Sequence, residues 1–497
     1  MNFNSIVLEP LLFSLTQRHH CNAYCIKEEF FTYERLAQEV AKIRTLLAHV
    51  SDKNVGLVAN DDIYTYASIY ALWLEGKAYV PLHPGQPLER CLDIIQQVGM
   101  TVVLDSSKST RYNDIPVVNT SLEAPKDYVL EAPKAAEESD LAYILFTSGS
   151  TGRPKGVQIM RSNVAAFVDA FHSLGFIATP EDRCLQMFDL TFDMSVQSYL
   201  IPILGGACTY TVSYERIKYQ AVFELLDDHR LTMASLVPSV IHYLRPYMDE
   251  IDQPEMCYCF FAGEALPTDD TREWSKCIPN AQIWNLYGPT ENTIYCTAYL
   301  YKRDEQNKET NGTLSIGFAM KGTEVIFVDD DTKLLPNNTK GEMCLAGPCL
   351  TKGYWNDEEK NKQAFFEHDG KRFYRTGDVC AIDDEGDIGY YGRKDSQIKI
   401  QGFRIELGEI EHVARSFYNE EFAVVALPLY DGDNNCFIHL VIETATLNNE
   451  EGLMNHFKKL LPHYMIPAKV HAVAKFPLNI SNKIDRKQLL ERIKNEK

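Results

Sequence analysis

A glycine-rich loop between two apolar segments most constrains how this chain can fold. The apolar run LAYILF, at 141–146, leads into TSGSTGRPKG, and VQIM then resumes the apolar pattern. A short apolar run bounded by turn residues predicts a buried strand. Glycines let successive backbone N–H groups face one concavity, hydroxyls donate to phosphate oxygens, and a lysine adds positive charge. The sequence therefore predicts a phosphate-binding loop made of Thr147, Ser148, Gly149, Ser150, Thr151, Gly152 and Lys155.

Two other interpretations of this loop are weaker. Runs of Ser, Thr and Gly are often solvated linkers, but this one follows a predicted buried strand and precedes another apolar segment. A Walker A loop requires Gly-Lys-Ser/Thr at the start of a helix, whereas here Pro154 precedes Lys155 and Gly156 follows it.

Composition excludes several classes of protein. The formal net charge of −20 argues against binding along nucleic acid. No apolar run approaches the roughly 18 residues that a membrane-spanning helix needs. Glu9 and Pro10 interrupt the first apolar run, and no basic segment precedes it, so we expect no signal peptide. The 13 cysteines are scattered and odd in number, which favours a reducing, cytoplasmic location over a disulfide framework.

The loop resembles the phosphate loop of the adenylate-forming, AMP-binding enzymes. This superfamily includes the acyl-CoA ligases, the luciferases and the adenylation domains of nonribosomal peptide synthetases. Further motifs match it in the same order: NLYGPTE at 285–291, YRTGD at 374–378 and PLNISNKIDR at 477–486. The resemblance covers residues 31–488, and alternating strand-like and helix-like segments agree with it because they predict parallel sheets covered by helices.

The resemblance implies a multi-domain α/β fold. Residues 1–394 are expected to form a large N-terminal AMP-binding domain of two α/β sheets and an antiparallel β subdomain. Residues 395–497 are expected to form a small, mobile α+β C-terminal domain, with a hinge at Asp395. In the family this domain swings between two half-reactions, and the loop around Lys399 and Gly402 is expected to serve the second one.

The resemblance also assigns a nucleotide site. Tyr287 is expected to stack on adenine, Asn285 to bind its edge and Asp378 to accept both ribose hydroxyls. If this motif stood alone, the aspartate beside a glycine could instead be an ordinary turn residue. The remaining expected contacts to ATP or AMP are Gly263, Glu264, Ala265, Gly288, Thr290 and Arg393.

Three residues are expected to carry the catalysis. Lys483 matches the family's lysine that bridges the substrate carboxylate and the α-phosphate, although Ser481 and Asn482 replace the usual Asn-Gly before it. Lys155 is expected to hold the departing phosphates, and Glu291 offers a hard oxygen ligand for Mg²⁺. The implied cofactors are ATP and Mg²⁺.

A substrate pocket follows from FDLTFDMS at 188–195. Asp193 lies in an apolar stretch, and burying a carboxylate is costly without a cationic partner. It could instead cap a helix. The stretch is similar to the motif of amino-acid-activating domains in which this aspartate binds the α-ammonium group. The other expected pocket residues favour a small or medium uncharged amino acid: Met194, Gln197, Ser235, Phe260, Ala262, Leu286, Ile294 and Tyr295.

The expected function is activation of an amino acid to its aminoacyl adenylate, with release of pyrophosphate, and its transfer to the phosphopantetheine thiol of a separate carrier protein. The carrier is expected to be separate because the sequence stops at Lys497. A D-alanine:carrier-protein ligase is a narrower alternative, which Ala262 weakens because those ligases have Cys there. Asp193 argues against an acyl- or aryl-CoA ligase, and the retained Lys155 and Lys483 argue against a nucleotide-binding pseudoenzyme.

Overall fold

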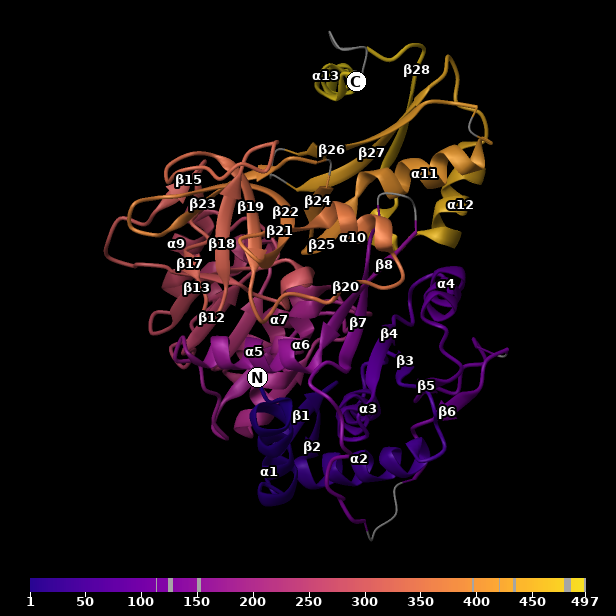
Figure 1. Ribbon diagram of the computed structural model, residues 1–497. Helices are drawn as coiled ribbons and strands as arrows, with labels where there is room; N and C mark the ends of the chain where they lie inside the picture. Colours follow the sequence, from indigo (N-terminus) through magenta and orange to yellow (C-terminus); the bar gives the residue numbers. More distant parts are fainter. Residues whose placement is uncertain are drawn as a thin grey trace. The chain divides into compact units, whose positions relative to one another are not determined.

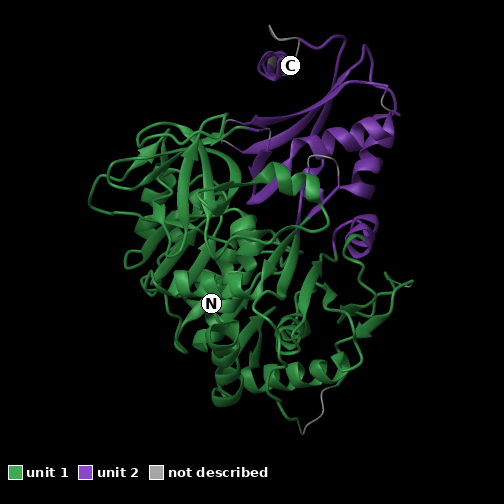
Figure 2. Ribbon diagram, in the orientation of Figure 1, with its two compact units in different colours: residues 1–84, 97–145, 156–394 green, residues 85–96, 146–155, 395–497 purple. Residues whose placement is uncertain are grey.

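The computed structural model describes residues 1–112, 114–123, 128–149, 153–395, 397–419, 421–431, 435–477 and 484–495. Two compact units make up the chain (Figure 2). The larger unit consists of Met1–Pro84, Gln97–Leu145 and Gly156–Lys394. The smaller unit combines Asp395–Lys497 with two earlier segments, Gly85–Gln96 and Phe146–Lys155, so the predicted phosphate loop belongs to it.

Nine strands form the first sheet among the described residues. Its central strands run parallel, and β2, β14 and β17 join antiparallel to their neighbours. In spatial order the strands are β17 (Phe318–Ala319), β14 (Thr297–Leu300), β13 (Gln282–Tyr287), β12 (Tyr258–Phe261), β11 (Met233–Leu236), β9 (Arg183–Gln186), β10 (Cys208–Thr211), β1 (Asn22–Ile26) and β2 (Glu29–Thr32).

The second sheet has seven strands in the described part of the chain. In order they are β20 (Gly353–Tyr354), β8 (Lys155–Met160), β7 (Leu141–Thr147), β4 (Ala78–Leu82), β3 (Asn54–Val58), β5 (Val103–Asp105) and β6 (Val117–Asn119). The apolar run before the phosphate loop is therefore β7, and it pairs in parallel with β4.

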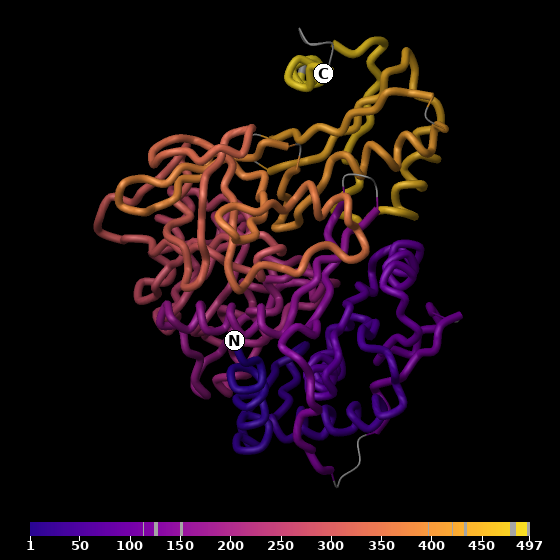
Figure 3. The backbone as a smooth tube through the Cα atoms, in the orientation of Figure 1, coloured from indigo at the N-terminus to yellow at the C-terminus, as the bar shows by residue number. Residues whose placement is uncertain are grey.

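Antiparallel strands follow the two sheets in the larger unit, and Figure 3 traces the chain into them in orange. They are β18 (Glu324–Val328), β19 (Gly341–Ala346), β21 (Phe365–His368), β22 (Lys371–Ile382) and β23 (Ile388–Arg393), with the small pair β15 (Glu309–Thr310) and β16 (Thr313–Leu314). Two α/β sheets and an antiparallel subdomain confirm the predicted fold class.

Helices connect and cover these strands (Figure 1). Thr32 and Asp62 cap α2 and α3 through hydrogen bonds from the N–H groups of Arg35 and Thr65. The helical segments of the larger unit are η1 (Asn4–Leu8), α1 (Glu9–Gln17), α2 (Tyr33–Leu47), α3 (Ile63–Leu74), α5 (Arg161–His172), α6 (Asp193–Gly205), α7 (Lys218–His229), α8 (Pro238–Leu244), η2 (Arg245–Glu250), α9 (Thr268–Cys277), η3 (Thr290–Asn292) and α10 (Glu358–Ala364).

The core of the larger unit is centred on α3 and α6, which are buried along nearly their whole length. α6 packs against β9 and β10 of the first sheet. The Tyr199 hydroxyl on α6 shares a 2.8 Å hydrogen bond with the hydroxyl of Tyr79 on β4, in the second sheet. Buried polar groups need partners, and this pair satisfies two hydroxyls at once. One buried helix thereby joins both sheets.

The smaller unit has its own core. It contains a three-stranded sheet and a hairpin whose Phe403 ring stacks on Tyr464 with 3.8 Å between centroids. A core of its own is what an independently packed unit requires. Its elements are α4 (Leu88–Val98, which runs into the larger unit), β24 (Gln397–Ile400), β25 (Phe403–Glu406), α11 (Leu407–Phe417), β26 (Val424–Tyr430), β27 (Cys436–Glu443), α12 (Glu450–Leu460), η4 (His463–Met465), β28 (Lys469–Val473) and α13 (Arg486–Asn495).

Gly317 provides a test of how tightly the strands of the larger unit pack. It has φ +74°, and a Cβ there would lie 1.9 Å from the carbonyl oxygen of Ala298 on β14. We expect Gly317→Ala to lower the free energy of unfolding by about 3 kcal/mol, because the β14 backbone would have to move.

Gly312 is the matched control, since it has φ +78° but a Cβ added there would meet nothing within 4 Å. Gly312→Ala should cost only the conformational strain, about 1 kcal/mol. Equal losses in urea unfolding of the two variants would contradict the close packing at Gly317.

Candidate active site

The predicted substrate residues gather at the carboxyl ends of three adjacent strands. Ser235 on β11 and Phe260 on β12 are paired across the sheet, and Ala262 follows β12 directly, its N–H bonded to the Leu236 carbonyl at 3.1 Å. Leu286 lies near the end of β13, the next strand. The carboxyl ends of parallel strands are where α/β folds place their ligands. The side chains of all four predicted residues are buried.

Asp193 is the first residue of α6 and is 9% exposed. The cap position belongs to Phe192, so the helix-cap alternative for Asp193 is wrong. A carboxylate in the first turn is favoured by the helix dipole. The Asp193 side chain is nevertheless buried, away from most of the solvent.

Two tyrosine hydroxyls lie close enough to Asp193 for its charge to affect their pKa values. Burial raises the pKa of both Tyr143 and Tyr295, and the Asp193 charge raises each further. Both phenols therefore stay protonated and can act as donors. Neither hydroxyl has a hydrogen-bond partner among the described residues. Tyr295 is one of the predicted pocket residues; sequence reasoning missed Tyr143, because its place in β7 marked it only as core.

Two of the predicted pocket residues, Ser235 and Gln197, are hydrogen-bonded to each other. The Ser235 hydroxyl donates to Oε1 of Gln197 at 2.7 Å, and the Ser198 hydroxyl reaches the same oxygen at 3.3 Å. These contacts fix the orientation of the Gln197 amide. The apolar residues of the prediction are buried as well: Met194, Phe260, Ala262, Leu286 and Ile294.

Helix α5 supports the same region. Its Phe171 ring lies 5.4 Å from the Phe260 ring, and its Phe167 ring lies 6.0 Å from the Tyr295 ring, centroid to centroid. Aromatic contacts of this kind hold the rings in defined positions. The shape of the region is therefore set by α5 as well as by the strand ends.

Glu291 lies in η3 and is fully buried. The Tyr354 hydroxyl donates to its Oε1 at 2.7 Å, and the Glu291 carbonyl accepts from the Thr351 N–H at 2.8 Å. Both contacts come from the segment leading into and forming β20. A carboxylate held this way suits a hard cation, because Mg²⁺ is bound in proteins by one or two carboxylates together with phosphates.

Tyr287, Asp378 and Arg393 form one hydrogen-bonded group. The Tyr287 hydroxyl donates to Oδ2 of Asp378, and Nη1 of Arg393 lies 3.0 Å from Oδ1. Asp378 and Arg393 face each other across β22 and β23. Burial, reinforced by Asp378, raises the pKa of Tyr287, so the phenol keeps its proton.

The other predicted nucleotide residues of the larger unit follow β12 or lie in or after β13, and they differ in hydrogen bonding and exposure. The Asn285 amide donates to the Ser315 carbonyl at 2.9 Å, and Glu264 accepts from the Ser239 N–H at 2.9 Å. Gly263 has φ +88°, in the left-handed region that favours glycine. Ala265 is exposed, whereas Gly288 and Thr290 are partly buried.

The phosphate loop lies in the smaller unit and is already hydrogen-bonded there. Ser148 donates to the Arg404 carbonyl at 2.8 Å, and the Gly149 N–H donates to Oε2 of Glu409 at 3.1 Å. Lys155 lies close enough to Glu406 to oppose the rise in the pKa of that carboxyl that burial causes. Sequence reasoning missed Glu409, because nothing in the local pattern of α11 links it to a loop 260 positions away.

Some predicted residues lie outside the described residues: Ser150, Thr151, Gly152 and Lys483. Of the predicted hinge and its loop, Asp395 is exposed and accepts from the Gln397 N–H at 3.1 Å. Lys399 is on β24, and Gly402 has φ +81° in the turn between β24 and β25. The roles of Asp395, Lys399 and Gly402 remain predictions.

Each unit by itself contributes described residues that suit part of a nucleotide–Mg²⁺ complex. The Thr147 hydroxyl at the start of the phosphate loop is buried and has no hydrogen-bond partner in the described chain, so a phosphate oxygen would satisfy it. Glu291 supplies a buried carboxylate oxygen of the kind Mg²⁺ prefers.

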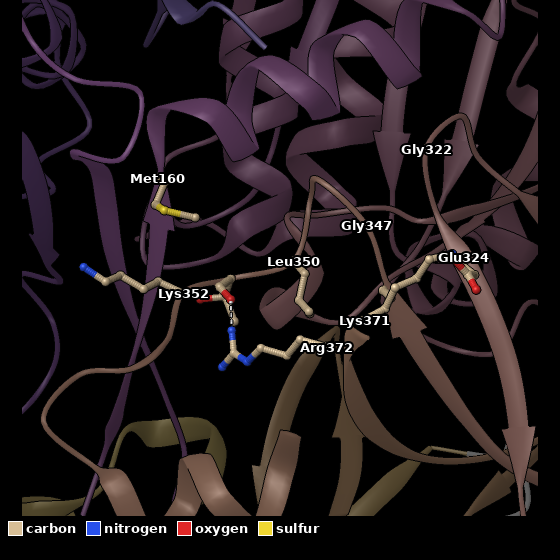
Figure 4. Close-up of a pocket in the computed structure, with 10 residues that line it drawn as sticks. Met160, Gly322, Glu324, Gly347, Leu350, Lys352, Lys371 and Arg372 are labelled. Atoms are coloured by element: carbon tan, nitrogen blue, oxygen red, sulfur yellow. Dashed lines mark hydrogen bonds and ion pairs between the residues drawn. The ribbon is translucent and has the colours of Figure 1, made fainter. Parts of the chain in front are cut away.

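A separate cavity of about 510 Å³ opens in the larger unit (Figure 4). Arg372 points into it and donates to the Thr351 carbonyl at 3.0 Å, while Lys352 and an ion pair between Lys371 and Glu324 flank it. None of the predicted site residues lines this cavity. It is therefore distinct from the predicted substrate and nucleotide contacts.

Comparison with known proteins decides the family. The chain matches the family described as "AMP-binding enzyme" over residues 14–355, more than half of its length. The chain belongs to the AMP-binding enzyme family. This confirms the resemblance on which the fold and the enzyme class were predicted.

Relatives of two kinds match the chain. It is 31% identical over 482 residues to the D-alanine--D-alanyl carrier protein ligase of Lactiplantibacillus plantarum, and the match covers 91% of this chain and 92% of the relative. It is also 30% identical over 487 residues to tyrocidine synthase 3 of Brevibacillus parabrevis, with 94% of this chain covered. The chain spans only 7% of the length of that synthase.

Solved structures give the same fold. The adenylation domain AlmE of Vibrio cholerae, in complex with glycyl-adenosine-5'-phosphate, superposes with a TM-score of 0.84 at 24% sequence identity. The superposition covers 99% of this chain and 98% of that one. Among the described residues, no helix is both long and apolar enough to cross a membrane.

Asp378 offers a direct test of the hydrogen-bonded group around it. We expect Asp378→Asn to lower the free energy of unfolding by about 2 kcal/mol, because Arg393 and Tyr287 would share a neutral amide in place of a buried carboxylate. Urea unfolding measures this, with Asp330→Asn as control, since Asp330 is an exposed carboxylate paired with Lys394. Equal stability of the two variants would show that the Asp378 charge contributes nothing to this group.

Proposed function

We propose that the chain activates an uncharged amino acid as its aminoacyl adenylate and then transfers it to a carrier-bound thiol. The observation that carries the proposal is the buried carboxylate of Asp193 at the start of α6, whose charge reaches the buried phenols of Tyr143 and Tyr295. A positive group stabilises a buried carboxylate, and the α-ammonium group of an amino acid supplies one.

In the first half-reaction, an oxygen of the substrate carboxylate attacks the α-phosphorus of ATP. The bond from the α-phosphorus to the bridging oxygen of the β-phosphate breaks, and pyrophosphate leaves. Phosphoryl and nucleotidyl transfers are accelerated mainly by positioning and charge neutralisation. Lys483 would hold the two negative reactants together, and Lys155 and the phosphate loop would bind the leaving pyrophosphate. Glu291 would hold Mg²⁺, which neutralises phosphate charge.

The second half-reaction transfers the aminoacyl group to a thiol, forming a thioester and releasing AMP. A carrier protein bearing phosphopantetheine is the proposed thiol donor, in keeping with the carrier protein ligases among the relatives. We propose Asp395 as the hinge of residues 395–497, with Lys399 and Gly402 serving this step.

The substrate proposal rests on the side chains near Asp193. Met194, Phe260 and Leu286 are apolar and buried, and the Gln197 amide is held by Ser235. Asp193 is the only charged residue among the predicted pocket residues. An uncharged side chain of small or medium size therefore fits best, and D-alanine is the narrower candidate that similarity to the carrier protein ligases suggests. An acyl- or aryl-CoA ligase is not favoured, because its substrate has no ammonium group to pair with Asp193.

Amino-acid-dependent exchange of labelled pyrophosphate into ATP tests this proposal. We expect one uncharged amino acid to give the strongest exchange, from a panel of both alanine enantiomers, other amino acids, and fatty and aryl acids. Lys483→Ala should slow this exchange about 100-fold or more, because a positioned cation is lost from the transition state. Lys487→Ala is the matched control, since Lys487 is exposed on α13 and has no predicted role.

Exchange with fatty or aryl acids alone would overturn the assignment of Asp193. Equal exchange rates in the Lys483→Ala variant and its control would overturn the role of Lys483.

A further inference from the structure

A carboxylate of the protein occupies one of the anion-binding groups of the phosphate loop. The Gly149 N–H, predicted to bind phosphate, instead donates to Oε2 of Glu409 at 3.1 Å. Glu409 lies on α11, within the same compact unit as the loop, and is fully buried.

The hydroxyl of Ser148, a second predicted phosphate-binding group of the loop, is also hydrogen-bonded to the protein. The Ser148 hydroxyl donates to the Arg404 carbonyl at 2.8 Å and accepts from the Glu406 N–H at 3.2 Å. The segment from Arg404 to Glu409 thus makes three hydrogen bonds with the loop. A backbone N–H has one hydrogen to donate, so Gly149 cannot fully serve Glu409 and a phosphate at the same time.

Arg90 on α4 stabilises this arrangement in a buried place. Its Nη1 lies 2.6 Å from Oε1 of Glu409, the oxygen that Gly149 does not use. Burial opposes the charge on Arg90, but its neighbours, led by the Glu409 carboxylate, more than offset that, so the pKa of Arg90 is raised. A carboxylate that is paired and hydrogen-bonded can remain ionised in the interior.

Phosphate is the natural replacement for this carboxylate. Both are anions whose oxygens accept strong hydrogen bonds from N–H groups and from guanidinium. If a neutral group displaced Glu409, Arg90 would be left as an unpaired buried charge. A phosphate would restore a negative charge to the same donors.

From these contacts we infer that Glu409 is an internal competitor for phosphate at Gly149, so that Glu409 and the phosphates of a nucleotide or of pyrophosphate occupy the loop in turn. The identity of that phosphate rests on the proposed function. Binding of ATP requires Glu409 to leave the Gly149 N–H. The return of Glu409 favours release of pyrophosphate after the adenylate has formed.

Glu409→Gln tests this inference, with inorganic pyrophosphate as the probe and calorimetric titration of the full chain as the measurement. The variant keeps the shape of the side chain but loses the charge that competes with phosphate. We expect the Kd for pyrophosphate to fall about tenfold, which corresponds to a loop that Glu409 occupies about nine-tenths of the time.

Glu411→Gln is the matched control. Glu411 is a buried carboxylate on the same helix, and it accepts from the Ala426 N–H at 3.0 Å and from Nη2 of Arg486 at 2.7 Å, away from the loop. Its variant should bind pyrophosphate as the unmodified chain does. An unchanged or raised Kd in Glu409→Gln would overturn the inference.

Glu409→Asp provides a second route if the glutamine variant does not fold. The shorter side chain keeps its charge beside Arg90 but withdraws from Gly149, so the Kd for pyrophosphate should again fall.

Lys155→Ala separates this inference from the proposed function, because it should weaken pyrophosphate binding whatever Glu409 does. If Lys155→Ala leaves that Kd unchanged, the phosphate-loop assignment fails; if only the Glu409 variants leave it unchanged, competition by Glu409 fails.

Discussion

The hydrogen bond between the Tyr79 and Tyr199 hydroxyls, 2.8 Å long, ties the buried helix α6 to the second sheet. Since α6 also packs against β9 and β10 of the first sheet, the helix is held from both sides. Its first residue, Asp193, is thereby fixed relative to the strand ends that carry Ser235 and Phe260. A side chain held by two sheets cannot adjust far, which suits the proposed recognition of one small cationic group.

Asp378 and Glu409 are buried carboxylates stabilised in the same way. Asp378 and Glu409 are each paired with an arginine, Arg393 and Arg90, and each also accepts a hydrogen bond from a second donor. Pairing of this kind offsets the cost of removing a carboxylate from water. For Glu409 the second donor belongs to the phosphate loop, so one pair serves both the packing of the smaller unit and the exchange of anions.

Local motifs in the sequence predicted much of the fold and the types of residue in the candidate site. The apolar run at 141–146 proved to be β7, and three residues predicted for the pocket, Ser235, Phe260 and Leu286, lie on adjacent strands. Such features depend on short-range periodicity and on the rule that parallel strands present their carboxyl ends at one edge.

Contacts between distant segments could not be predicted in the same way. Asp378 was recognised from YRTGD, but its bond to Tyr287 joins residues 91 positions apart. The inclusion of Phe146–Lys155 in the smaller unit, and the bond from Gly149 to Glu409, likewise depend on tertiary packing. Local pattern left open whether Asp193 caps the helix, and only the structure shows that Phe192 takes that position and leaves Asp193 inside the first turn.

The central claim is that Asp193 recognises the ammonium group of the substrate. The most direct measurement compares kcat/KM for the preferred amino acid with kcat/KM for its desamino analogue, which has the same side chain and carboxylate. We expect a preference of about 100-fold or more for the amino acid in the unmodified chain, and loss of most of that preference in Asp193→Asn. Equal activity toward the two acids, or a preference that survives Asp193→Asn, would contradict this claim.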